Sequence, residues 1–103
     1  MTLLTQKEID HHLEPLSAWE LVGHEITRTF TRKNFVEAIE FVDTVAELAE
    51  EADHHPDILI HGWNNVTITL STHSEGGLTE KDFELASKIE AKARETEDVE
   101  SKR

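Results

Sequence analysis

Hydrophobic and polar residues alternate along this chain with two different periods, and each change of period marks an element. A period near 3.6 predicts a helix, and a period of two predicts a strand with one buried face. Helical periods occur near the N-terminus, over residues 35–52 and from Thr79 onward, with period-two stretches between them. The predicted order is helix, two strands, long helix, two strands, helix.

The first half of the chain contains a short helix and two strands. Thr5 and Glu8 have capping-box spacing, and the apolar residues that follow recur at helical spacing as far as Leu16. His11 and His12 lie on this helix and are interpreted as exposed polar residues. Residues 19–22 predict a short strand. Residues 24–32 predict a longer one, with Ile26 and Phe30 facing the core.

A helix of about five turns is predicted to begin after Asn34, which is expected to be its N-cap, and to pack on the sheet. Its predicted buried stripe consists of Phe35, Ala38, Ile39, Val42, Val45, Ala46, Ala49 and Ala52. Pro56 disfavours a helical conformation in the residue before it, so the chain is expected to leave the helix between His54 and His55.

The second half predicts a hairpin and a final helix. Residues 57–61 are apolar and β-branched, and residues 66–73 alternate apolar residues with polar ones. Asn64-Asn65 between them suits the backbone of a tight turn. The final helix begins at Thr79 and buries Leu85, Ile89, Ala86 and Ala93. Residues 94–103 lack periodicity and predict a frayed or disordered tail.

These elements predict one domain over residues 1–103 with an α+β fold, a four-stranded antiparallel sheet with three helices packed on one face. An exposed edge strand in so small a chain suggests a homodimer or a homotetramer.

Charge and composition narrow the possible functions. The chain has 22 acidic residues against 10 Lys and Arg, a formal net charge of −12, which disfavours direct contact with DNA or RNA. The excess of negative charges also repels itself within the compact fold unless salt screens it, which suggests a salt-adapted protein. There is no cysteine, so disulfides and thiolate chemistry are excluded. No apolar run is long enough to cross a bilayer, and a soluble cytoplasmic protein is expected.

The most distinctive stretch runs from Glu50 to Asp57 and contains two adjacent histidines among carboxylates. Imidazole has an ordinary pKa of about 6.5, and neighbouring carboxylates can shift it, so this cluster suits proton transfer. Further along the chain His73 ends the last predicted strand, and Asp82 lies at the start of the final helix. Glu50 precedes His54 by one helical turn, a spacing at which side chains meet.

The ordered set Glu50, His54-His55-Pro56, Trp63, His73 and Asp82 resembles the signature of the pterin-4a-carbinolamine dehydratase family. A second block of similarity runs from Val66 to His73 and continues through Gly77-Leu78-Thr79 and Leu85-Ala86-Ser87. The resemblance covers roughly Trp19 to Ala93. One departure is a segment after Pro56 that is one residue longer than in some relatives and lacks the aromatic residues often found there.

The resemblance implies dehydration of a 4a-hydroxytetrahydropterin to quinonoid dihydropterin and water, without a cofactor or a metal. His54 and His73 would be the leading general acid/base candidates, with His55 as a third member. The implied substrate-binding residues are Glu50, Asp53, Trp63, Ser71, Thr72, Asp82 and Trp19.

Each of four binding residues has a structural alternative. Trp19 and Trp63 could serve packing alone, Glu50 could be a solvated acid, and Asp82 could be a helix cap for Thr79.

Two other functions compete with the dehydratase. Animal members of the family also act as dimerisation cofactors of a homeodomain transcription factor, which makes a pterin-binding or protein-interaction module the main alternative. A metal-dependent hydrolase built on the His and Asp residues is disfavoured, because the spacing lacks a His-Glu-x-x-His helix or a comparable ligand set.

Overall fold

The computed structural model describes the backbone of residues 2–101 and the side chains of residues 2–95. The elements in order are α1 (Gln6–Leu13), β1 (Glu20–Val22), β2 (Glu25–Thr31), α2 (Phe35–Ala52), β3 (Asp57–His61), β4 (Asn65–Leu70), the 3-10 turn η1 (His73–Glu75) and α3 (Glu80–Ser101). The four strands pair antiparallel in the order β1-β2-β4-β3, and the predicted α+β architecture is confirmed.

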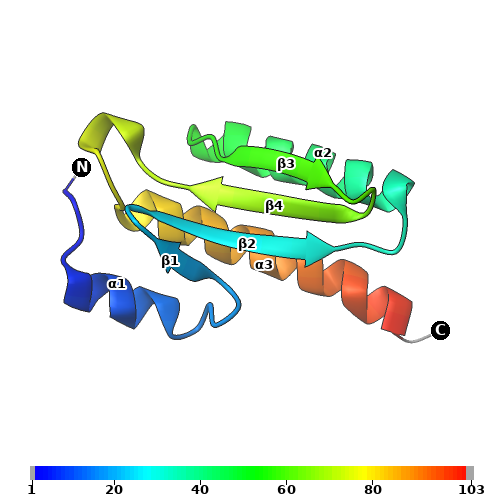
Figure 1. The fold of residues 1–103 in the computed structure, drawn as a ribbon, viewed down its shortest axis with the longest axis horizontal. Helices are drawn as coiled ribbons and strands as arrows, with labels where there is room; N and C mark the ends of the chain where they lie inside the picture. The colour runs from blue at the N-terminus through cyan, green and yellow to red at the C-terminus, as the bar shows by residue number, and fades with distance from the viewer. Residues whose placement is uncertain (1, 102–103) are drawn as a thin grey trace.

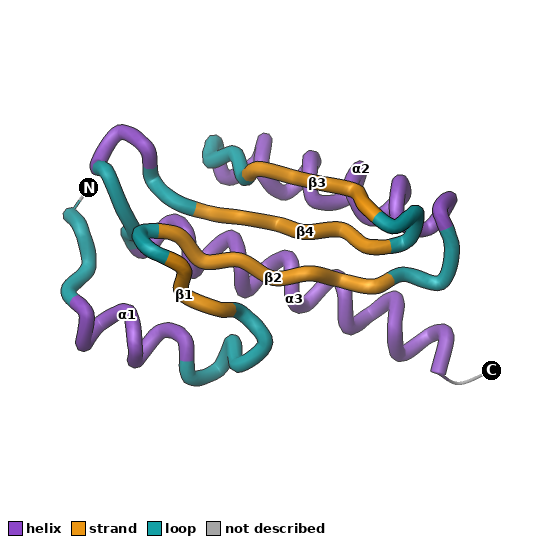
Figure 2. Tube along the Cα trace, in the orientation of Figure 1, coloured by secondary structure: helices purple, strands orange, loops and turns teal. Residues whose placement is uncertain are grey.

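Helices α2 and α3 lie side by side across one face of the sheet (Figures 1 and 2). The register pairs Ile26 with Leu70 and Phe30 with Val66, so these buried side chains point toward the helices. On the opposite face, threonines of β2 bond to threonines of β4, with Thr27 and Thr69 hydroxyls 3.1 Å apart. The alternation of apolar and threonine residues in β2 therefore gives one face to the core, and no helix within residues 2–101 covers the other face.

Capping boxes and N-caps form where the sequence predicts them. The Thr5 hydroxyl accepts from Glu8 N–H, the Glu8 carboxylate accepts from Thr5 N–H, and Asn34 Oδ1 accepts from Glu37 N–H. Helix α1 packs against α3 through His12, whose ring stacks on Phe83 at 5.0 Å between centroids. His12 is therefore half-buried and not fully exposed as predicted, because it lies on the side of α1 that faces α3.

The buried stripe of α2 differs from the prediction. It consists of Ala38, Phe41, Val45 and Ala49, whereas Phe35, Ile39 and Ala46 are exposed. The helix is rotated so that Phe41 packs on Phe30 of β2, with ring centroids 4.9 Å apart. The sequence interpretation gave one apolar stripe without Phe41, and the packing of α2 on the sheet decided which side of the helix is buried.

Both ends of β4 differ from the prediction as well. The turn between β3 and β4 places its positive φ angles at Gly62 (55°) and Trp63 (59°) and not at Asn64-Asn65. The Asn64 amide instead donates to the Arg32 carbonyl, which ties the turn to the end of β2. Strand β4 ends at Leu70, and His73 belongs to η1, because the chain turns away from the sheet to reach α3.

Helix α3 continues to Ser101, with Leu85, Ala86, Ile89 and Ala93 buried as predicted. The backbone of residues 94–101 is helical despite the lack of sequence periodicity there, and residues 102–103 lie outside the described part, so the expectation of a frayed or disordered tail over residues 94–103 stays a prediction. Within the described residues, no helix has the length and apolarity needed to cross a membrane.

Candidate active site

The two adjacent histidines follow a sharp reversal of the chain at the end of α2. Asp53 adopts a left-handed conformation with φ of 50°, the Asp53 N–H bonds to the Glu50 carbonyl, and the His54 N–H bonds to the Ala49 carbonyl at 3.1 Å. This pair of bonds is a Schellman motif, which satisfies the last carbonyls of a helix. The prediction of a break between His54 and His55 is therefore wrong, since the helix ends at Ala52 and both imidazoles lie beyond it.

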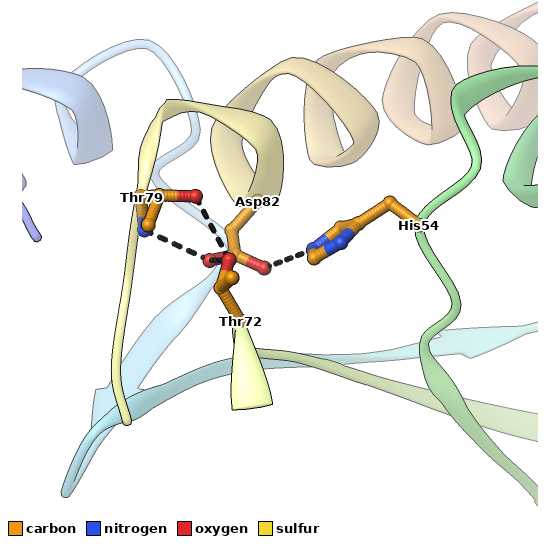
Figure 3. Close-up of polar contacts among 4 residues, drawn as sticks. All are labelled: His54, Thr72, Thr79 and Asp82. Carbon is orange, nitrogen blue, oxygen red and sulfur yellow. Dashed lines mark hydrogen bonds and ion pairs between the residues drawn. The ribbon is translucent and has the colours of Figure 1, made fainter. Parts of the chain in front are cut away.

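The reversal turns His54 inward onto the start of α3. His54 Nε2 lies 2.5 Å from Asp82 Oδ1, and the exposed fractions of the two side chains are 10% and 0%. Figure 3 shows the imidazole reaching the carboxylate from the segment that follows α2. A charge-assisted bond this short and this buried fixes the orientation of the ring.

Asp82 accepts two further hydrogen bonds through Oδ2. One comes from the Thr79 N–H at 3.0 Å, and the other comes from the Thr72 hydroxyl at 2.9 Å (Figure 3). The Thr72 hydroxyl donates its one hydrogen to Asp82. The Thr79 hydroxyl, whose oxygen lies 2.8 Å from the Thr72 hydroxyl oxygen, therefore donates to Thr72. Asp82 therefore caps α3, as one of the two sequence interpretations expected, and also holds His54, whereas its expected role in binding substrate stays a prediction.

The second imidazole lies on the surface. His55 Nε2 is 2.5 Å from Glu50 Oε2, and both side chains are more than half exposed. Glu50 was expected to meet His54 one helical turn later. That expectation is wrong, because the left-handed residue Asp53 redirects the chain and brings His55 back toward Glu50. Asp53 itself is exposed and shapes the site through its backbone conformation.

His73 lies at the same end of the sheet as the other two histidines. Asp57 pairs with Thr69, so the residues before β3 and the residues after β4 emerge at one edge. Ser71 is half-buried there, Thr72 is buried in the Asp82 network, and His73 begins η1 with its side chain exposed. The fold therefore gathers all three predicted catalytic histidines at this end of the molecule.

The two tryptophans lie elsewhere. Trp63 is at the far end of the β3–β4 hairpin, and five residues of β3 at about 3.3 Å each separate that end from the histidines by roughly 16 Å. Trp19 is 4% exposed, and its Nε1–H donates to Glu90 Oε1 at 2.9 Å. In this chain both side chains therefore lie away from the histidine cluster.

Two features of the structure were missing from the sequence interpretation. Thr79 was expected only as a helix start, although its hydroxyl completes the Asp82 network. Buried Glu90 joins Trp19, Arg28 and Arg94, a cluster spanning 71 residues at its widest pair and without a local sequence signal. Over the described part of the chain, no three His, Asp or Glu side chains gather closely enough to hold a metal ion.

The model of the pterin 4 alpha carbinolamine dehydratase family matches residues 2–92. The chain belongs to this family. Its relatives include a Sulfolobus acidocaldarius protein named "Putative pterin-4-alpha-carbinolamine dehydratase", 48% identical over 84% of this chain and 93% of that one. A Picosynechococcus protein of the same name is 53% identical over 82% and 91%.

Solved structures agree with the assignment to the dehydratase family. A transcriptional coactivator/pterin dehydratase from Brucella melitensis superposes with a TM-score of 0.84 at 40% identity, covering 89% of this chain and 99% of that chain. A pterin dehydratase-like protein identified as a RuBisCO assembly factor in the alpha-carboxysome has a TM-score of 0.60 at 26% identity, covering 73% and 86%.

Proposed function

We propose that this protein dehydrates a 4a-hydroxytetrahydropterin to quinonoid dihydropterin and water by general acid/base catalysis through histidines. The observation that carries the proposal is the buried His54–Asp82 pair, set at the edge of the sheet where His55 and His73 also lie. Family membership and the names of the relatives support the substrate class.

The reaction needs two proton movements. The departing C4a hydroxyl must gain a proton to leave as water, and the neighbouring ring nitrogen must lose one as the C4a–N double bond forms. Positioned acids and bases typically contribute about 10²- to 10⁴-fold to such steps. Three imidazoles at one edge supply the kind of group that most often carries out such proton transfers.

His54 is assigned as the positioned base or acid because Asp82 determines which of its ring nitrogens can act. The carboxylate oxygen can only accept, so His54 Nε2 carries the hydrogen that points at it. In the neutral ring this leaves the lone pair on Nδ1, and Nδ1 is the atom that would exchange a proton with the pterin. Asp82 and Thr72 therefore act as positioning residues behind His54.

His55 and His73 are assigned to the opposite proton movement and to contact with the flat pterin ring. Both are exposed, and the bond from His55 to Glu50 orients the His55 imidazole. Glu50, Asp53 and Ser71 stay candidates for binding the pterin edge from the surface side. Trp19 is assigned to packing in the core, and Trp63 is assigned to the turn between β3 and β4. Within this chain both lie away from the histidine cluster.

A protein-interaction function is the second candidate. It is favoured by two structural neighbours, one described as a transcriptional coactivator/pterin dehydratase and one as a RuBisCO assembly factor. Such a role would use an outer surface and would not need the His54–Asp82 pair. The net charge of −12 still argues against direct nucleic-acid contact. Edge strand β3 supports a homodimer or a homotetramer, which sedimentation would test.

The decisive experiment follows the loss of 4a-hydroxypterin absorbance with purified protein, with and without a chelator. The wild type should be active and insensitive to chelator, and His54→Ala and His73→Ala should each lower kcat/KM by about 10²-fold or more. His61→Ala is the matched control, since this exposed histidine bonds the Thr67 hydroxyl and lies at the opposite end of β3 from His55. An inactive wild type would favour the interaction function, and full activity in both variants would reject the histidine assignment.

A further inference from the structure

His73 lies on a small closed loop of residues 72–77, called here the His73 loop. The Thr72 N–H donates to the Gly77 carbonyl at 2.8 Å, and the Gly77 N–H bonds back to the Thr72 carbonyl at 3.4 Å. Gly76 adopts a left-handed φ of 74° and donates its N–H to the His73 carbonyl. These bonds hold the loop backbone together, so the anchors at its two ends contribute to the position of His73.

One end is anchored by the site itself, and the other by the N-terminal strap, defined as residues 2–5. At the first end the Thr72 hydroxyl bonds Asp82. At the second end the Leu4 N–H donates to the Leu78 carbonyl at 2.9 Å. A Cβ added to Gly77 would lie 3.1 Å from Leu3 Cδ2, so the strap passes directly against the loop. Figure 1 shows the N-terminal segment running beside the chain between η1 and α3.

The strap contributes to the position of the loop because the space behind the loop is hollow. A cleft of about 330 Å³ lies between the strap, α1 and the β1–β2 turn, and Leu3, Ile9, Leu21, His24 and Gly77 contribute to its lining. The cleft leaves part of the loop without packed side chains behind it, so fewer van der Waals contacts resist a shift of the loop. On this side the Leu4–Leu78 bond and the close approach of Leu3 to Gly77 restrain the loop, together with the buried residues Leu78 and Thr79 that follow it.

We propose that the N-terminal strap is a positioning element for His73, with Leu4 as the key residue through its backbone N–H. This inference rests on the proposed function of His73 and adds to it a determinant 69 residues away in sequence. General acid/base transfer needs the imidazole within hydrogen-bond reach of the reacting atom. A displacement of about 1 Å can cost about 10²-fold in rate.

The test compares Leu4→Pro with Leu4→Ala. Both remove the leucine side chain, but only proline removes the N–H that bonds the Leu78 carbonyl. We expect kcat/KM to fall about tenfold further in Leu4→Pro than in Leu4→Ala. In a His73→Ala background the same pair of substitutions should differ by less than about twofold, because a positioning effect vanishes once the positioned group is gone.

A readout independent of turnover is the NMR signal of the His73 ring, assigned by its loss in His73→Ala. It should shift in Leu4→Pro and stay unchanged in Leu4→Ala, and the His54 signal should not move in either. A wild type without dehydratase activity would reject the proposed function, and the ring signal would still decide whether the strap positions His73. Equal kcat/KM and an unmoved His73 signal in the two Leu4 variants would overturn the inference.

A second pair of variants covers the case in which Leu4→Pro fails to fold. Gly77→Ala introduces a methyl group 3.1 Å from Leu3 Cδ2, at a backbone position outside the left-handed region. It should shift the His73 ring signal, and adding Leu3→Ala should return that signal toward its wild-type position. If Leu3→Ala has no effect on the shift caused by Gly77→Ala, the strap does not restrain the loop.

Discussion

Asp82→Asn is the substitution for which the structure makes the most specific prediction. The carboxylate accepts three hydrogen bonds, from His54 Nε2, the Thr72 hydroxyl and the Thr79 N–H. An asparagine has only one oxygen, and placing it at the Oδ2 position keeps the two threonine bonds. The amide NH₂ then faces His54 Nε2, which must become an acceptor, and the imidazole hydrogen moves to Nδ1.

The expected magnitudes separate catalysis from stability. Hydrogen bonds to charged groups are worth about 1.5–3 kcal/mol and neutral ones about 0.5–1.5, so losing the charge of a fully buried acceptor should cost about 1–3 kcal/mol. In a domain of this size that lowers Tm by roughly 5 to 20 °C. The activity should fall much further, by about 10²- to 10⁴-fold, since the proton-accepting lone pair of His54 would point at the amide and away from the pterin.

Three measurements test this reasoning. The 15N chemical shifts of His54 should report the change of tautomer. Urea denaturation measures the free energy of unfolding, and the absorbance assay measures kcat/KM. Glu80→Gln is the matched control, because Glu80 is an exposed carboxylate at the start of the same helix, and it should change stability by less than about 0.5 kcal/mol. An Asp82→Asn protein that keeps kcat/KM within about threefold, or whose His54 keeps its hydrogen on Nε2, would refute the positioning role.

Three further predictions follow from the surface groups. His55→Gln should lower kcat/KM at least about tenfold while changing the free energy of unfolding by less than about 0.5 kcal/mol, because its bond to Glu50 is exposed; a stability loss matching the activity loss in urea melts would contradict this. Bonds from the N–H and hydroxyl of Thr5 hold the pKa of Glu8 below its ordinary 4.5, so the capping box stabilises α1 above the unfolded pKa and is lost as pH falls through the lower folded pKa. An NMR titration should show this, with the pKa of Glu8 rising in Thr5→Ala, and an unchanged pKa would count against it. Finally, with a net charge of −12, Tm should rise between about 0.01 M and about 1 M salt, and a flat response would remove the idea of salt adaptation.

Local patterns in the sequence were sufficient for the order of the elements and for several of their ends. Thr5 and Asn34 cap helices where predicted, since a cap bonds the backbone only three residues away. Ile26 and Phe30 face the core because a strand alternates its side chains whatever it packs against. The candidate histidines were also found from the sequence, because their spacing to Glu50, Trp63 and Asp82 forms a recognisable set.

Which partner each side chain meets was decided by the tertiary structure. Phe41 replaced Phe35 in the buried stripe of α2 because the rotation of a helix is set by the sheet beneath it. The left-handed Asp53 exchanged the expected partner of Glu50 from His54 to His55.

Asp82 could be recognised from sequence as a cap, but its bond to His54 joins segments 28 residues apart. The bond between Trp19 and Glu90 joins segments 71 residues apart. Sequence periodicity carries information over only a few helical turns. Contacts between distant segments depend on how whole helices and strands pack, and only the tertiary structure determines that packing.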